Sequence, residues 1–134
     1  MQVIYIDAAK STTLTQEALG VFERNPVDPP LKEGHELIVL RINGIFAAYA
    51  KVFRAPENDV LDFLEVSPDF RGRHYEGTKI SRMIFAEAFK RCADFSSCLV
   101  LTRYTDKGRR SLLPMEDDLA KEYPQVKVCH QPGV

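Results

Sequence analysis

The sequence predicts a domain of the α+β class, in which helices and a mixed β-sheet form three layers. Two observations carry this prediction. Asn43-Gly44 separates two apolar runs, which is the strongest local signal for an antiparallel hairpin. Farther along, an apolar run that ends at Val66 leads through a loop into a helix with a broad apolar stripe and then into another apolar run. That order is typical of a strand-loop-helix-strand crossover, whose two strands are parallel.

Size and composition limit the possible classes of protein. A chain of 134 residues is expected to form one domain, residues 1–134, with a core that needs no disulfides. Its three cysteines are not clustered, which indicates reduced thiols in a cytoplasmic protein and neither a disulfide framework nor a metal site. No signal peptide and no membrane-spanning run is visible. A net charge of −1 argues against a general nucleic-acid binder.

The N-terminal half is expected to hold a strand, a helix and the hairpin. Residues 3–6 predict a short strand, and residues 14–23 predict a helix with apolar residues on one face and a capping-box spacing before it. Residues 25–35 contain three prolines and a glycine and predict a loop. Residues 36–42 and 45–53 form the two arms of the hairpin.

The C-terminal half begins with the central strand, at residues 60–66. A helix is expected over residues 78–93 and a strand over residues 97–104, apolar on both faces as in a parallel pair. Thr105-Asp106 can cap another helix, in which Pro114 predicts either a kink or a new helix start. Leu112, Met115 and Leu119 are expected to face inward. Val126 and Val128 predict a last strand, and the tail after His130 is expected to be loose.

The loop after the central strand has the features of an anion-binding site. It contains Arg71, Gly72, Arg73 and Gly77 and leads into a helix N-terminus, where the first N–H groups have no partner and the dipole favours negative charge. The span from Arg71 to Arg110 holds ten basic and four acidic residues, for a net charge of +6, whereas the remainder carries −7. A basic half fits a phosphorylated ligand, and it fits equally a solvated helix face.

The motif V-x-P-x-x-R-G at residues 66–72 resembles the coenzyme A pyrophosphate loop of the GNAT-type N-acetyltransferases, V-x-P-x-x-R-G-x-G-x-G. The element order, with an antiparallel meander, a crossover and a truncated C-terminal hairpin, resembles the GNAT fold. The sequence departs from the motif after Arg73, since His74 replaces a glycine and Gly77 comes one residue late. The resemblance implies acetyl-coenzyme A as co-substrate, bound by Val66, Arg71, Gly72, Arg73, His74, Gly77 and Thr78.

The resemblance also implies transfer of an acetyl or other acyl group to an amine. In this family a backbone N–H of the central strand, here near Val66, commonly stabilises the oxyanion, and a carboxylate on that strand often serves as the general base. Asp62 and Glu65 are the candidates. On a regular strand they would point to opposite faces, with Asp62 on the side of Leu64 and Val66, where burial would raise its pKa. Either carboxylate can instead face solvent.

The general acid of the family is often a tyrosine in the pattern N-x-x-A-x-x-x-Y, which this sequence lacks. Tyr104 is the nearest phenol and is the candidate for this role. Three functions therefore stay open: an acyltransferase acting on a small-molecule, protein or peptide amine, a catalytically inactive GNAT-fold protein that binds coenzyme A or regulates a partner, and an unrelated interaction domain. A homodimer is also open, because a shortened C-terminal edge could be completed by a partner strand.

Overall fold

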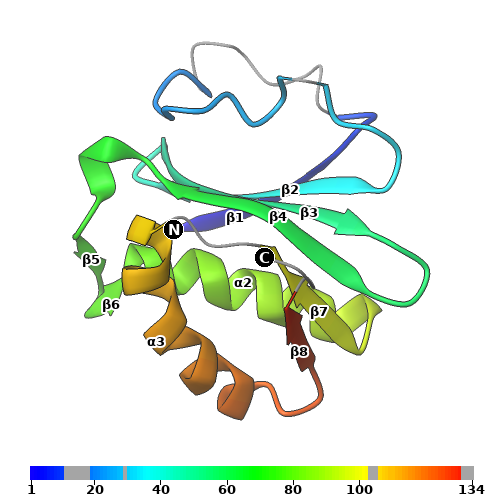
Figure 1. Cartoon of the computed structure of the whole chain (residues 1–134). Helices are drawn as coiled ribbons and strands as arrows, with labels where there is room; N and C mark the ends of the chain where they lie inside the picture. The colour runs from blue at the N-terminus through cyan, green and yellow to red at the C-terminus, as the bar shows by residue number, and fades with distance from the viewer. Residues whose placement is uncertain (11–18, 29, 103–105, 131–134) are drawn as a thin grey trace.

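The computed structural model describes residues 1–10, 19–28, 30–102 and 106–130, which form a mixed six-stranded sheet with helices on one face (Figure 1). The strand order is β1-β2-β3-β4-β7-β8, and β5 and β6 form a separate small hairpin. The elements are β1 (Gln2–Asp7), β2 (His35–Ile42), β3 (Ile45–Arg54), β4 (Asp59–Val66), a 3-10 turn η2 (Pro68–Phe70), β5 (His74–Tyr75), β6 (Thr78–Lys79), α2 (Ile80–Phe95), β7 (Cys98–Leu101), α3 (Asp106–Glu122) and β8 (Lys127–His130). This arrangement confirms the predicted α+β class.

The predicted hairpin is confirmed. β2 and β3 pair antiparallel around Asn43-Gly44, whose φ angles of 52° and 79° are both positive, as a two-residue turn that matches the strand twist requires. β1 pairs antiparallel with β2, and β4 pairs antiparallel with β3, so the first four strands form the expected meander.

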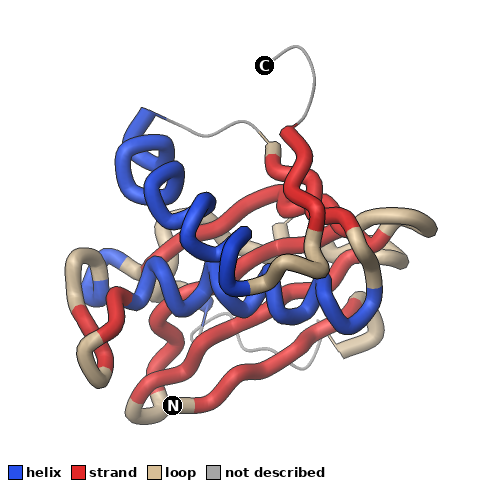
Figure 2. The backbone as a smooth tube through the Cα atoms, turned by 90° about the horizontal axis from the view of Figure 1, so that it is seen from below, coloured by secondary structure: helices blue, strands red, loops and turns tan. Residues whose placement is uncertain are grey.

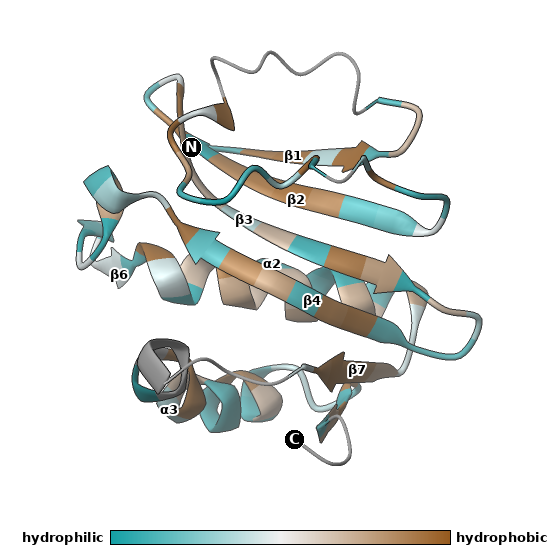
Figure 3. Cartoon of the chain, turned by 45° about the horizontal axis from the view of Figure 1, so that its top comes forward, coloured by the Kyte–Doolittle hydropathy of each residue, from teal (hydrophilic) through white to brown (hydrophobic). Residues whose placement is uncertain are grey.

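The predicted crossover is also confirmed, since β4 leads through α2 to β7 and the two strands are parallel. Figure 2 shows α2 lying along the sheet. The apolar stripe of α2 is buried against the sheet and consists of Ile80, Ile84, Phe85, Ala88, Phe89 and Cys92. β4 and β7 pair only between Asp59↔Leu99 and Leu61↔Leu101. The pairing ends there because β7 ends at Leu101, and Figure 3 shows the short β7 beside the first half of β4 only.

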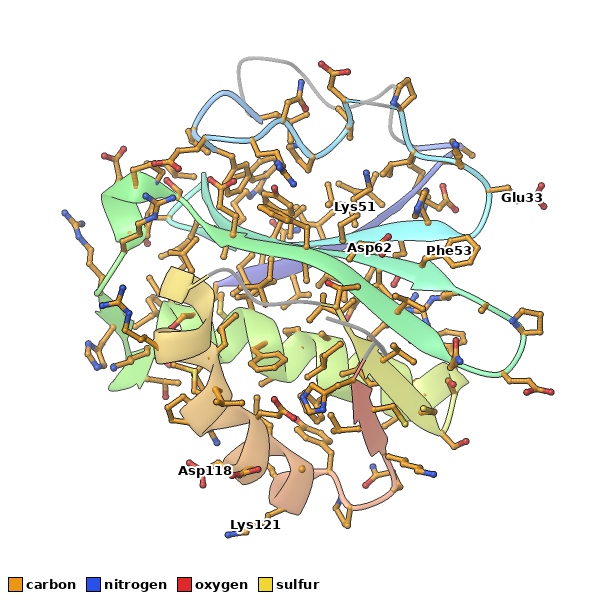
Figure 4. The ribbon with its side chains drawn as sticks, in the orientation of Figure 1. Glu33, Lys51, Phe53, Asp62, Asp118 and Lys121 are labelled. Atoms are coloured by element: carbon orange, nitrogen blue, oxygen red, sulfur yellow. The ribbon has the colours of Figure 1, made fainter. Side chains whose placement is uncertain are left out.

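A β-bulge at Asp62 overturns the regular alternation expected for the central strand. The pairing with β3 skips this residue, so Leu61 and Leu64, three positions apart, both pack in the core on the α2 side. Asp62 instead lies near His35 and Lys51 on the opposite face of the sheet (Figure 4). The prediction that Asp62 shares a face with Leu64 and Val66 is therefore wrong, because the extra residue reverses the alternation.

The last described elements are α3 and β8. α3 continues through Pro114, which excludes the alternative of a new helix starting there. Leu112 and Leu119 are buried and Met115 is half-buried, so this face points inward as predicted. β8 pairs parallel with β7, and the described residues therefore end in a single edge strand in place of an antiparallel hairpin.

The second face of the sheet is covered by residues 19–28 and 30–34 (Figure 1). Leu19, Phe22 and Leu31 are buried there against a cluster that includes Leu37 and Tyr49. Residues 14–18, half of the predicted helix 14–23, lie outside the described residues. Leu19 is helical, but residues 20–23 form a turn and a bend, so the helix end predicted at residue 23 is wrong. None of the described helices is long and apolar enough to cross a bilayer.

Cys98 and Cys129, which are far apart in the sequence, approach each other across β7 and β8, with their Sγ atoms 3.2 Å apart. We expect oxidised glutathione to convert this thiol pair into a disulfide by two exchange steps, releasing two molecules of reduced glutathione. Burial and the Cys129 thiol raise the pKa of Cys98, so the reaction should accelerate as the pH rises and thiolate forms. Peptide mapping under non-reducing conditions would detect the link.

Cys92 is an internal control for this prediction. It is fully buried, and burial raises its pKa to about 12, so it should stay reduced under the same treatment. Protein that carries glutathione on Cys98 or Cys129 without forming the disulfide would contradict the prediction.

Candidate active site

A cleft of about 640 Å³ lies beside the second half of β4, beyond the point where its pairing with β7 ends. Its walls come from the second half of β4, the loop after it, the start of α2 and the middle of α3, together with a short segment on the opposite face of the sheet. The lining residues are 23–24, 63–66, 71–73, Lys79, Ser81, Leu112 and Met115. The loop found by its motif therefore forms part of a real concavity.

The second half of β4 presents an unpaired strand edge to this cleft. The N–H of Ser67 donates to the carbonyl oxygen of Ala47 at 2.8 Å, and this register directs the N–H groups of Leu64 and Val66 away from β3. On that side β7 has already ended. The carbonyl oxygen of Val66 points the same way, since it accepts a hydrogen bond from Arg71 Nε at 3.1 Å. Two backbone donors thus face the cleft near the position expected for an oxyanion donor.

The loop and the start of α2 form a cationic end of the cleft. Gly72 has a φ of 73°, a conformation that favours glycine, and no side chain caps α2. The first N–H of α2, that of Ile80, donates to Arg73, whereas the next helical positions have no intrahelical acceptor. In the described part of the chain, Arg73 and Lys79 have no carboxylate within ion-pair distance. This end would attract an anion.

Arg71 is engaged differently. Its Nη1 lies 2.8 Å from Glu23 Oε1, its Nη2 lies 3.9 Å from Glu65 Oε2, and its Nε binds the carbonyl of Val66. The hydrogen bond and charge of Glu23 raise the pKa of Arg71. Arg71 therefore links the end of β4 to residue 23 on the other face of the sheet, and it is not available to a ligand without losing these contacts.

Glu65 is buried and holds residues 23–24 against the end of β4. Its carboxylate accepts hydrogen bonds from the backbone N–H groups of Glu23, at 2.7 Å, and Arg24, at 3.1 Å. The hydroxyl of Tyr49 also donates to it, at 3.4 Å. Burial, with the charge of Glu65 as the next cause, raises the pKa of Tyr49, so the phenol stays protonated and can keep donating. Of the two predicted catalytic side chains that the structure describes, Asp62 and Glu65, Glu65 lines the cleft.

Asp62, the other predicted catalytic side chain that the structure describes, lies on a different part of the sheet. Asp62 is outside the cleft lining, and its Oδ2 is 3.6 Å from His35 Nε2. Burial raises the pKa of Asp62, while His35 and Lys51 oppose this shift. The regular strand that would have placed Asp62 differently is interrupted by the bulge. Tyr104 lies outside the described residues.

The expected helix start at Thr78 is corrected to Ile80, because the residues before it form the β5–β6 hairpin. This hairpin pairs His74 with Lys79 around a turn at Glu76-Gly77, where both φ angles are positive, 49° and 83°. The hairpin contains the one residue that this loop has in addition to those of the family motif. His74, Gly77 and Thr78 do not line the cleft, whereas Val66, Arg71, Gly72 and Arg73 do.

Several lining residues were missed by the sequence analysis. Lys79 and Ser81 could have been found by placing the helix start at Ile80, the first residue of the buried stripe. Glu23 and Arg24 carry no local signal, since they reach the cleft only through the contact of their segment with Glu65. Leu112 and Met115 were predicted as inward-facing and also line the cleft. Within the described residues, no three His, Cys, Asp or Glu side chains form a metal-binding group.

Comparisons with known proteins give the fold an independent basis. No family model matches the sequence, and no curated protein matches it. Among solved structures, a ribosomal-protein-alanine N-acetyltransferase from Brucella melitensis biovar Abortus 2308 matches 86% of this chain and 91% of its own, with 15% identity and a TM-score of 0.61. The ribosomal-protein-S18-alanine N-acetyltransferase of Escherichia coli matches 88% and 76%, with 14% identity and a TM-score of 0.60.

A third structure, Escherichia coli ElaA, matches 70% of each chain with 18% identity and a TM-score of 0.50. At these low sequence identities, the comparisons are evidence for the fold alone. Together with the meander and the crossover, they show that this chain has the fold of the GNAT-type N-acetyltransferases.

Proposed function

We propose that this protein is an acyltransferase that moves an acetyl group from acetyl-coenzyme A to an amine. The observation that carries the proposal is the cleft beside the second half of β4. There, in the described part of the chain, a strand edge without a partner leads to a glycine-containing loop and to a helix start that no side chain caps. Acetyl-coenzyme A, a thioester with a pyrophosphate at its far end, fits this combination. The strand edge can bind the amide groups of its pantetheine arm, and the loop and helix start can bind its pyrophosphate.

The pyrophosphate of coenzyme A is assigned to the cationic end. Arg73 and Lys79 supply charge, and Gly72 lets the backbone approach closely. The N-terminus of α2 adds its N–H groups and dipole. The amide groups of the pantetheine arm are assigned to the open edge of β4, where an extended chain can exchange hydrogen bonds as a further strand would. His74, Gly77 and Thr78 flank the loop from the small hairpin.

The reaction needs few side chains. The lone pair of a neutral amine attacks the thioester carbonyl carbon, the C–N bond forms, the C–S bond breaks, and the sulfur leaves as a thiolate. The amine nitrogen gives up one proton and the thiolate takes up one, so the products are an amide and coenzyme A. We assign the oxyanion to the N–H of Val66 or Leu64.

Proton transfer is assigned to water at the cleft, because Glu65 already accepts hydrogen bonds from two backbone N–H groups. Glu65 then acts as a positioning residue. The same engagement of Glu65 favours a second candidate function, a GNAT-fold protein that binds coenzyme A without turnover. Release of free thiol from acetyl-coenzyme A in the presence of amines would distinguish the two. A cytoplasmic location, where cysteines stay reduced, is part of the proposal.

The first test is thermal unfolding in the presence of acetyl-coenzyme A, free coenzyme A or ATP. A ligand at about a hundred times its dissociation constant stabilises the fold by about 2.7 kcal/mol, which is several degrees in Tm for a domain of this size. We expect similar shifts with both forms of coenzyme A and a smaller shift with ATP, which has phosphates but no pantetheine arm. The absence of any shift at millimolar coenzyme A would overturn the proposal.

A further inference from the structure

Arg24 lines the cleft on the face of the sheet that carries Tyr49 and Phe63, and its position is fixed by several contacts. Its backbone N–H donates to Glu65 Oε1 at 3.1 Å, and its carbonyl oxygen lies 3.5 Å from the hydroxyl oxygen of Tyr49. Its guanidinium group lies 4.2 Å from the centre of the Phe63 ring, which itself stacks on Tyr49. Both the main chain and the guanidinium group are therefore held on the face of the sheet away from α2.

The charge of Arg24 is not neutralised by the acids around it. Among the described residues, no carboxylate lies within ion-pair distance of its guanidinium group, and no side-chain hydrogen bond of Arg24 occurs. The two acids of the cleft wall, Glu23 and Glu65, both pair with Arg71 instead. A planar guanidinium stacked on an aromatic ring keeps its N–H donors along its edge, where they match the two oxygens of a carboxylate.

The cleft is lined by basic residues from both sides of β4. Lys79 immediately precedes α2, which packs on one face of the sheet, whereas Arg24 lies against Phe63 on the face of the Tyr49 cluster. If coenzyme A extends from the loop along β4, its thioester ends near Val66, and the acceptor must approach from the side of Arg24. We propose that Arg24 binds a carboxylate of the acceptor and so selects amines that carry a carboxylate nearby. This inference rests on the proposed acyl transfer.

Two sources of such a carboxylate exist, a free amino acid and a peptide whose second residue is acidic. The test therefore compares glycine with glycinamide, and the peptide Ala-Glu-Ala-amide with Ala-Gln-Ala-amide, as acceptors for wild type, Arg24→Gln and Arg24→Lys. In at least one pair, Arg24→Gln should raise the KM of the carboxylate form roughly tenfold, as expected for loss of one charge-assisted bidentate contact. The KM of the amide form and of acetyl-coenzyme A should not change.

Comparing the carboxylate-to-amide ratio of KM between variants cancels the effect of amine basicity, which differs between glycine and glycinamide but is the same for every variant. Arg24→Lys keeps the charge without the planar fork and should retain only part of the preference. The pair that responds identifies the source of the carboxylate. An unchanged ratio of carboxylate to amide KM in both pairs would overturn the inference, and a uniform loss of kcat for all acceptors would assign Arg24 a structural role.

A binding measurement keeps the inference testable if no transfer occurs. The acetylated forms of the same four compounds are titrated calorimetrically into the protein saturated with free coenzyme A. Carboxylate probes should bind wild type more tightly than their amide partners, and Arg24→Gln should abolish the difference. If coenzyme A binds but carboxylate and amide probes bind alike, the inference fails while the coenzyme A site stands. If coenzyme A itself does not bind, the proposed function fails, and the carboxylate preference is then measured without it.

Discussion

Replacing Glu36 by alanine is expected to lower the free energy of unfolding by about 3 kcal/mol, or roughly 10 °C in Tm. Glu36 is buried at the end of the sheet opposite the small hairpin and binds two arginines from different elements. Its carboxylate receives Arg91 Nε and Nη2, both at 2.9 Å, and Arg54 Nη2 at 2.7 Å. The substitution would remove three charge-assisted hydrogen bonds and leave two partly buried cations without their shared anion.

The network around Glu36 ties four strands to the crossover helix. Arg54 on β3 also pairs with Asp59 on β4 at 2.7 Å, and Arg91 comes from α2. The guanidinium of Arg91 lies between two rings, 4.1 Å from the centre of Tyr5 on β1 and 4.4 Å from that of Phe95. Loss of Glu36 would therefore loosen the packing of α2 on the sheet as well as remove its own hydrogen bonds.

A matched control is available on the surface. Arg82 and Glu122 form an ion pair of 3.0 Å between α2 and α3, with side chains 32% and 52% exposed. Glu122→Gln should change the free energy of unfolding by about 0.5 kcal/mol or less, because exposed pairs contribute little. Urea unfolding of both variants beside wild type measures the difference. Equal effects of the two substitutions would contradict the view that burial decides the contribution of these pairs.

The pH dependence gives a second readout for Glu36. Burial alone would raise the pKa of Glu36, but the hydrogen bonds from Arg91 and Arg54 outweigh it and hold that pKa below its ordinary value. The stabilisation is therefore fully present above the pKa of an unfolded glutamate and is lost as the pH falls through the lower folded pKa. The difference between wild type and Glu36→Ala should shrink in acid. A difference that stays constant down to pH 3 would indicate that the loss comes from packing alone.

The sequence was sufficient for the features that depend on neighbouring residues. Asn43-Gly44 determines its turn because both residues adopt positive φ, and the apolar stripe of α2 follows from its own spacing. The location of the loop also followed from a local motif. These features are encoded within about twenty residues, so that a pattern along the chain is enough to recognise them.

The features that the sequence could not reveal depend on pairing between distant segments. The bulge at Asp62 is a property of how β4 pairs with β3, and a one-residue change of register reverses the faces of every residue after it. Likewise, Arg71 was expected to bind phosphate because it is the arginine of the V-x-P-x-x-R-G motif. Its engagement by Glu23 and Glu65 becomes visible only when the second face of the sheet is in place.

The second large effect is expected in coenzyme A binding. The double variant Arg73→Ala/Lys79→Ala should weaken the affinity for coenzyme A roughly 100-fold, since two charge-assisted contacts of about 1.5 kcal/mol each would be lost. Isothermal titration calorimetry with free coenzyme A measures this directly. The variant should unfold at nearly the same temperature as wild type, because neither side chain forms an ion pair within the described residues.

Lys90→Ala/Lys127→Ala is a control with the same change in charge. Both lysines are exposed and neither lines the cleft, so the affinity should change by about threefold or less through long-range electrostatics alone. A loss of affinity as large as that of the cleft variant would mean that net charge, and not the loop, determines binding.

Arg71→Ala distinguishes two assignments of the pyrophosphate. If Arg71 bound the phosphates, it would have to release Glu23 and Glu65, and the phosphates would then lie near two carboxylates that have lost their cation. Such an arrangement costs more than binding beside Arg73 and Lys79, where no acid has to be displaced. Arg71→Ala should therefore lower the stability of the 23–24 segment and change coenzyme A affinity by less than tenfold. A larger loss of affinity than in the double variant would show that the Arg71 contacts rearrange on binding and would transfer the pyrophosphate assignment to Arg71.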